Sequence, residues 1–235
     1  MFRENNWGAP RIHAELLKLG FKVHERTVSR YIPKQPTAPD VLKRWMTFLR
    51  NHRDCLVGMD FFTVPTATFR VLYVFFIIHH LRRQILHFVV TAQPYAEWII
   101  QQLREAFPYD SAPRYAILDR DGKYGKLVPA ALKAMGVNPV RAAYRAPWQN
   151  SVAERWIGSA RREMLNHVVV FGERHLQRLL SQYIVYYHED RCHLGLSKDS
   201  PNGRPVVPAP SRKARVVALP RVGGMHHRYE WRNTA

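Results

Sequence analysis

The sequence predicts an α/β domain with a mixed sheet, preceded by two short helices and followed by a basic, proline-rich tail. Apolar segments at 55–62, 69–80 and 84–91 are rich in Val, Ile, Phe and Tyr, which is typical of consecutive strands. From residue 94 onward helical and strand patterns alternate, which indicates a sheet covered by helices. With 46% hydrophobic residues, the chain can bury a substantial core.

Residues 1–33 have the pattern of a partial helix-turn-helix segment. Pro10 begins the first helix and Gly20 ends it, and a second short helix is expected over 25–32. A plain helical hairpin is the alternative, and the basic composition favours DNA binding. The residues of the second helix expected to reach DNA phosphates or base edges are Arg26, Ser29 and Arg30.

Three regions follow this segment. Prolines between 33 and 39 mark a linker, which we place at 34–53. The core, 54–200, contains the three strands and, in order, a helix at 96–107, a strand at 114–119, a helix closed by Gly136, a short strand at 138–143, the helix of Glu154 and a last helix at 175–190. The tail, 201–235, holds seven Lys or Arg, five prolines and a single acid, and is expected to be mainly a solvated arm with a small hairpin near Gly223.

Charge and cysteine content restrict the partners and the compartment. The chain has 36 Lys and Arg against 18 Asp and Glu, a net charge of +18, which favours nucleic acid as the partner. A ribosomal or membrane-surface protein is the alternative. Cys55 and Cys192 are too few for a disulfide framework, and no signal peptide is expected, so we predict a soluble protein of a reducing, intracellular compartment.

The segment 71–78 is the longest apolar run. It is far shorter than the ~20 residues of a membrane helix, and no membrane association is expected. It is better interpreted as a strand buried on both faces.

Three acidic residues stand out against the basic background: Asp60, Asp119 and Glu154. Asp60 lies inside an apolar strand, and Asp119 is projected at the carboxyl end of another, where open α/β sheets form their sites. A buried carboxylate needs a proton or a cation. Carboxylate oxygens suit Mg²⁺ or Mn²⁺, and two such ions about 4 Å apart can act on a phosphodiester. Asp121 is expected to be a loop residue or a partner of these acids.

The helix of Glu154 supports this interpretation. Its buried stripe is predicted to be Val152, Trp156, Ala160 and Met164. Glu154 falls near the opposite side, and its face also holds Gly158, Arg161 and Arg162. That face therefore presents a carboxylate, a gap without a side chain, and two phosphate-binding arginines. Ordinary surface charge pairing is the alternative, although Gly158 offers Glu154 no partner.

Other cofactor sites are not indicated. His52 and Cys55 have the spacing of half a zinc site, but no second pair matches them. No glycine-rich phosphate loop precedes a helix, so no nucleotide cofactor is expected.

At these residues the chain resembles the retroviral-integrase-like catalytic core of DDE recombinases, specifically the transposases of bacterial insertion sequences. The clearest marker is PWQNSVAERWIGSARRE, which is similar to the family's stretch leading to its catalytic glutamate, here Glu154. LDRDGKY and MDFF resemble the blocks with the two aspartates, Asp119 and Asp60. The segments YYHEDRCHLGL and HERTVSRYI are similar to the end of the core and to the preceding helix-turn-helix.

The resemblance implies a ribonuclease H-like fold with a five-stranded mixed sheet and a metal-dependent activity that cleaves and joins DNA. Asp60, Asp119 and Glu154 would hold two Mg²⁺ or Mn²⁺ ions per active site, and the protein would form homo-oligomers on double-stranded DNA at element ends and targets. The resemblance also implies a bacterial cytoplasmic protein that joins the nucleoid when bound to DNA. Further residues expected near DNA are Lys123, Trp148, Gln149, Asn150, Arg155, Arg161 and Arg162. Two alternatives stay open: a hydrolytic nuclease of the same fold, and a truncated regulator that binds DNA without cutting it.

Overall fold

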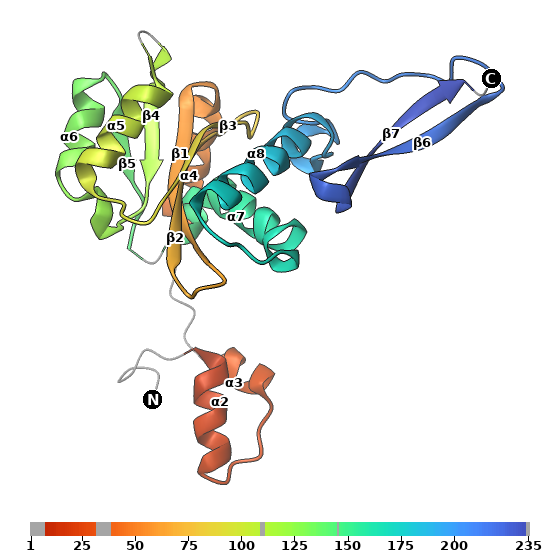
Figure 1. Ribbon diagram of the computed structural model, residues 1–235. Coiled ribbons are helices and arrows are strands. Elements are labelled where there is room, and N and C mark those ends of the chain that lie inside the picture. Colours follow the sequence, from red (N-terminus) through yellow and green to blue (C-terminus); the bar gives the residue numbers. More distant parts are fainter. Residues whose placement is uncertain (1–7, 32–38, 109–110, 145, 234–235) are drawn as a thin grey trace. The chain divides into compact units, whose positions relative to one another are not determined.

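The computed structural model describes residues 8–31, 39–108, 111–144 and 146–233 (Figure 1). The chain divides into two compact units, residues 1–47 and 48–235. No helix in the described ranges is both long and apolar enough to cross a membrane.

The first unit contains the two predicted N-terminal helices, α2 (Ala9–Lys18) and α3 (Glu25–Tyr31). Gly20 follows α2 with φ of +86°, a left-handed conformation that glycine adopts without steric cost. Ile12 and Val28 are the buried residues of this pair. The residues of α3 predicted to reach DNA, Arg26, Ser29 and Arg30, are all exposed.

Within the predicted linker, residues 39–52 form a helix, α4 (Pro39–His52), and the boundary between the two units falls inside it. Residues 34–38, the rest of its proline-rich part, lie outside the described residues. The prolines made the amphipathic pattern of this helix hard to recognise in the sequence. Side chains of its last turns are fixed by packing. Leu49 is buried, and the rings of Phe48 and His52 lie 5.3 and 4.6 Å from that of Tyr115.

The second unit is built on a five-stranded sheet, as the resemblance implied. Its strands are β1 (Leu56–Pro65), β2 (Val71–His79), β3 (Ile85–Thr91), β4 (Tyr115–Leu118) and β5 (Asn138–Arg141). The order is β3-β2-β1-β4-β5. The β1–β2 and β2–β3 pairs are antiparallel, whereas β1–β4 and β4–β5 are parallel, so the sheet is mixed.

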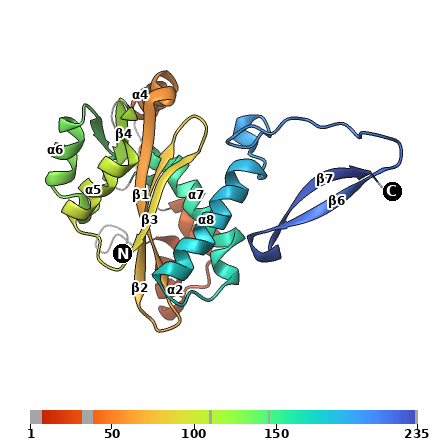
Figure 2. The same ribbon diagram turned by 45° about the horizontal axis from the view of Figure 1, so that its top comes forward.

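Helices cover both faces of this sheet (Figures 1 and 2). One face packs against α5 (Ala96–Ala106) and α6 (Leu127–Ala134), and the other against α7 (Ser151–Glu163) and α8 (Glu173–Glu189). Because strand side chains alternate between faces, each face contributes to its own core cluster. The predicted double burial of the 71–78 segment is confirmed, since Phe75 and Phe76 are both fully buried on opposite sides.

An ionic cluster joins α7 to α8 and the segment after it. Arg191 donates to both carboxylate oxygens of Glu163, with a shortest distance of 2.6 Å, and the Tyr183 hydroxyl donates to Glu163 at 2.9 Å. These bonds lower the pKa of Glu163 against the opposing effect of burial. The imidazole of His193 lies beside Arg191, with its ring edge-on to Tyr187.

His193 should make stability depend on acid pH. Burial, with the positive charges of Arg191 and Arg83, lowers its pKa from the ordinary 6.5 to about 4, against the hydrogen bond to Tyr187 and the charge of Glu163. Between pH 6.5 and pH 4 the unfolded chain therefore binds a proton at His193, whereas the folded protein does not. The contribution of His193 to the free energy of unfolding is complete above pH 6.5 and is lost as the pH falls toward 4. Between pH 7 and pH 4 the free energy of unfolding of the His193→Gln variant should therefore fall by about 2–3 kcal/mol less than that of the wild type. Urea denaturation across this range measures the difference, and parallel curves would contradict it.

The tail differs from the expected solvated arm. It forms an antiparallel hairpin of β6 (Ala214–Arg221) and β7 (His226–Asn233), with its turn at the predicted Gly223. A buried carboxylate that pairs with two arginines holds this hairpin in place. The side chain of Asp190, at the end of α8, is 1% exposed and accepts from Arg221 at 2.7 Å and from Arg228 at 3.0 Å.

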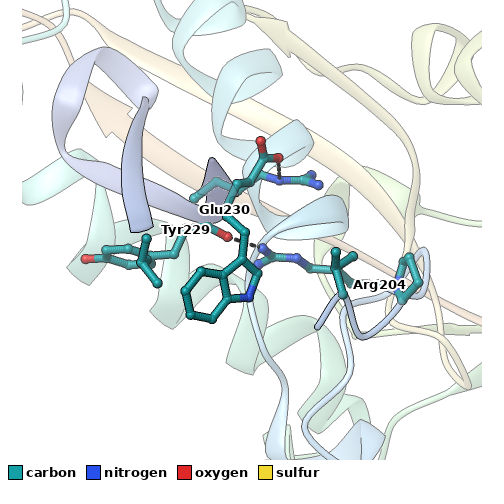
Figure 3. A pocket seen from close by; sticks show the side chains of 8 residues that line it. Arg204, Tyr229 and Glu230 are labelled. Atoms are coloured by element: carbon teal, nitrogen blue, oxygen red, sulfur yellow. Dashed lines mark hydrogen bonds and ion pairs between the residues drawn. The ribbon is translucent and has the colours of Figure 1, made fainter. Parts of the chain in front are cut away.

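A pocket of about 340 Å³ lies against this hairpin (Figure 3). Arg204 crosses it and donates to the main-chain oxygen of Tyr229 at 2.6 Å, and Glu230 pairs with Arg228. The charged groups labelled in Figure 3 are thus engaged with the hairpin itself.

Candidate active site

The three acids singled out in the sequence line one hollow, of about 360 Å³, in the second unit. It opens at Asp60 in the middle of β1, where the neighbouring strands β4 and β5 end, beside the start of α7. The residues that line it are Asp60, Asp119, Arg120, Asp121, Ala142, Ala143, Tyr144, Ala146, Pro147, Asn150 and Glu154.

Strand register brings the two aspartates together. Gly58 of β1 pairs with Ile117 of the parallel strand β4, and continuing this register by two residues places Asp60 beside Asp119. Alternation puts Asp60 on the same face as Phe62, whose ring packs on Trp156 of α7. The aspartates therefore face the helix that carries Glu154.

Burial and neighbouring negative charges raise the pKa values of both aspartates. Burial raises the pKa of Asp60 to about 7; the backbone N–H of Phe61 opposes this, and the charges of Asp119, Glu154 and Asp121 add to it. Burial also raises the pKa of Asp119, although the N–H of Asp121 donates to its carboxylate at 3.0 Å. A carboxylate such as Asp60, 7% exposed and among acids, is stabilised by a proton or a cation.

Glu154 reaches the hollow from the exposed side of α7. The predicted buried stripe of this helix is confirmed: Val152 is 7% exposed, and Trp156, Ala160 and Met164 are fully buried. Glu154 itself is exposed.

Asn150, just before α7, fixes this helix to the strand that holds Asp60. Its side-chain N–H donates to the main-chain oxygen of Met59 at 3.2 Å and lies 3.5 Å from the carboxylate of Asp60. A methyl group on Gly58 would lie 2.6 Å from the Asn150 oxygen. Glycine at this position lets the amide approach the strand.

Replacing Gly58 with alanine should therefore displace the Asn150 side chain from its position against β1. The added carbon would also lie 3.5 Å from Ile78, so the Asn150 amide has to move out of a covered position. We expect a loss of about 1–3 kcal/mol in the free energy of unfolding, typical of overpacking. Chemical denaturation measures it. Gly122→Ala is the matched control, since a carbon added there meets nothing within 4 Å, and equal losses in both variants would contradict the argument.

The donor set of this hollow suits a hard divalent cation. The acidic side chains that line it offer carboxylate oxygens, which Mg²⁺ and Mn²⁺ prefer as ligands. The raised pKa of Asp60 indicates that a positive charge in the hollow would stabilise its ionised form. Within the described ranges, however, no three His, Cys, Asp or Glu side chains converge as a metal-binding group. The carboxylates share the hollow without closing on a common point, and Glu154 is exposed.

The residues on α7 and near the hollow that were predicted to contact DNA fall into three groups. Arg155, Arg161 and Arg162 on α7 are exposed. Gln149 and Asn150 are 6% and 5% exposed and bond to the protein instead. Gln149 accepts from the N–H of Ala143 at 2.5 Å, so both amides hold the walls of the hollow and leave little surface for DNA.

Two further predicted contacts are partly buried. Trp148 precedes α7, and Lys123 follows β4. The ammonium group of Lys123 pairs with Asp121 at 2.6 Å and lies over the rings of Phe61 and Tyr73. Asp121 is thus a loop residue whose side chain pairs with Lys123 and whose N–H donates to Asp119, so both of the expected descriptions apply to it.

The expected gap beside Glu154 is filled. The guanidinium of Arg162 folds back over Gly158, where a methyl group would lie 2.9 Å from its Nη1. The correction follows from helix geometry, because residues four apart are neighbours on one face.

Arg120 and Tyr144 also line the hollow, and the sequence reasoning did not identify them. Arg120 donates from Nε to the oxygen of Ala142 at 3.1 Å, which links the loops after β4 and β5. A usable signal existed: parallel neighbouring strands end at the same edge, so residues after each strand come together.

Comparisons with known proteins agree with this architecture. Residues 135–201 match the family described as integrase core domain, and no curated protein matches the sequence. A chain of the simian T-cell lymphotropic virus intasome in complex with PP2A regulatory subunit B56 gamma superposes with a TM-score of 0.50 at 12% identity, covering 77% of this chain and 67% of that one. The Mos1 mariner transposase catalytic domain also gives 0.50, at 10% identity, covering 66% and 85%.

The chain has an integrase-like core. At these identities the structural likeness establishes the ribonuclease H-like fold and not the activity. The family match spans β5, α7 and α8, and thus includes Glu154, whereas Asp60 and Asp119 lie before it. Their place in the integrase-like core rests on the strand register and the shared hollow described above.

Proposed function

We propose that this protein is a DDE-type transposase that cleaves DNA strands and joins them to target DNA in a reaction that requires Mg²⁺ or Mn²⁺. The observation that carries the proposal is the meeting of Asp60, Asp119 and Glu154 in one hollow of an integrase-like core. A net charge of +18 supports double-stranded DNA as the partner.

The three acidic residues act together in this proposal. Burial, together with the negative charges of Asp119 and Glu154, raises the pKa of Asp60 to about 7, so that a bound cation would stabilise its carboxylate. Asp60, Asp119 and Glu154 would hold two divalent ions. Such ions supply the charge that activates an attacking oxygen and stabilises the leaving one. Asn150 and Gln149 keep the strand, the loop after β5 and α7 in register around the hollow.

Gel analysis of labelled duplexes tests the proposal. The duplexes should carry the DNA that flanks the coding region, because a mobile element places its ends there. With Mg²⁺ or Mn²⁺ we expect nicked strands first and longer, joined strands later, and none in EDTA. Nicks without joining would instead assign a hydrolytic nuclease. Absence of products with either metal, together with salt-sensitive DNA binding, would overturn cleavage and leave a DNA-binding regulator.

We further propose that the active form is a homo-oligomer on paired DNA ends. The intasome among the structural neighbours is itself an assembly, and joining two ends to one target requires more than one active site. Light scattering of the protein with and without end duplexes should show a mass increase that corresponds to several protomers. A complex of one protomer per duplex at saturation would contradict it.

A further inference from the structure

A second hollow of the same unit, of about 300 Å³, gathers arginines from three parts of the chain. Arg155 and Arg162 come from α7, Arg83 from the turn between β2 and β3, and Arg191 from the segment after α8. No described residue that lines it is acidic, and it shares no lining residue with the hollow of the carboxylates. We call it the four-arginine pocket.

Most of the charge in this pocket is uncompensated. Glu163 neutralises Arg191, but within the described part of the chain Arg83, Arg155 and Arg162 form no ion pair. Burial and the neighbouring charges of Arg155 and Arg191 lower the pKa of Arg83. Cations held together in this way repel one another, and an anion placed among them would remove the repulsion.

Two glycines make room for the guanidinium groups. A methyl group on Gly195 would overlap the guanidinium of Arg83, and one on Gly158 would lie 2.9 Å from Arg162. Gly195 does not have a positive φ, so the backbone there does not itself require glycine. Its lack of a side chain instead leaves space for the Arg83 guanidinium at this wall of the pocket.

We propose that the four-arginine pocket binds a phosphate group, supplied by a nucleic acid backbone or by free phosphate. Planar guanidinium groups donate paired hydrogen bonds that match phosphate oxygens, and several of them converge here in a hollow large enough for the group. The site is separate from the carboxylates and requires no cleavage. The sequence had indicated only Arg155 and Arg162, as exposed members of one helix.

Gly195→Ala tests the pocket without changing the net charge. The added methyl group displaces the Arg83 guanidinium, and Gly158→Ala does the same to Arg162. Binding of a fluorescent random-sequence duplex is measured in EDTA at several salt concentrations, and binding of pyrophosphate by calorimetry. Arg178→Gln is the control, since Arg178 is exposed on α8 outside the pocket and its loss changes only the total charge.

For a DNA phosphate we expect the double glycine variant to bind the duplex about fivefold or more weakly. The slope of log affinity against log salt should fall by about 0.9 for each lost phosphate contact, with Arg178→Gln nearly unchanged. For free phosphate, pyrophosphate binding is lost in the variant and duplex binding is kept. If both ligands bind wild type and variant alike, the proposal is overturned.

Folding is checked by melting temperature. If Gly195→Ala unfolds, Arg83→Gln removes the same guanidinium without adding a methyl group. Because all binding is measured without metal, failure of this proposal leaves the proposed strand cleavage untouched, and the reverse also holds.

Discussion

Replacing Glu154 with glutamine should lower the rate of DNA cleavage on the order of a thousandfold, because a metal-binding charge contributes several kcal/mol and each 1.36 kcal/mol is a factor of ten. Glutamine has the same shape but no charge. Glu154 is exposed and lies opposite the buried stripe of α7, so the free energy of unfolding should change by less than about 0.5 kcal/mol.

Single-turnover cleavage in Mg²⁺ and thermal unfolding, measured on the same preparations, separate the two effects. Asp60→Asn and Asp119→Asn should lose activity as severely while retaining duplex binding. Glu173→Gln at the start of α8, far along the chain from the hollow and exposed, is the matched control. A Glu154→Gln enzyme that cleaves at the wild-type rate would remove Glu154 from the site.

Replacing Trp156 with alanine should cost about 3–5 kcal/mol in the free energy of unfolding, enough to remove much of the stability of a typical domain. Trp156 is fully buried between α7 and the sheet. Its ring lies 4.3 Å from that of Phe76 and 5.6 Å from that of Phe62, so truncation leaves a cavity between two layers.

The contrast with Trp156→Phe makes this prediction specific. Within the described part of the chain, the indole Nε1 is buried without a hydrogen-bond partner, so phenylalanine removes an unsatisfied donor and keeps most of the packing. We expect it to cost less than about 1.5 kcal/mol. Urea denaturation of both variants gives the two values. Equal losses would show that the indole contributes something other than packing.

Much of this core could be predicted from local patterns. Apolar runs gave β1, β2 and β3, and a four-residue repeat gave the buried side of α7, because these periods follow from backbone geometry alone. Local composition was less informative in two places. Prolines concealed helix α4 within the predicted linker, and a basic, proline-rich tail suggested mainly an arm where Asp190 binds the hairpin of β6 and β7.

The candidate site shows the same division. Asp60, Asp119 and Glu154 stood out as acids in apolar or basic surroundings, and the tertiary structure supplied their common hollow. That Asn150 would be buried against β1 rather than face DNA could not be read from its neighbours in the sequence, because its partner Met59 lies 91 residues away. The same holds for Arg83 and Arg191, which reach one pocket from distant segments.

By itself, the sequence determined which segments become strands and helices, which of their sides are apolar, and which acids are exceptional. Hydrophobic periodicity and charge can be read from neighbouring residues in the sequence, without knowledge of the folded structure. Only the tertiary structure decided which distant side chains meet, that three carboxylates surround one hollow while four arginines surround another, and that one helix serves both. Burial is the physical reason, because it depends on packing between segments and sets both the raised pKa of Asp60 and the crowding at Arg83.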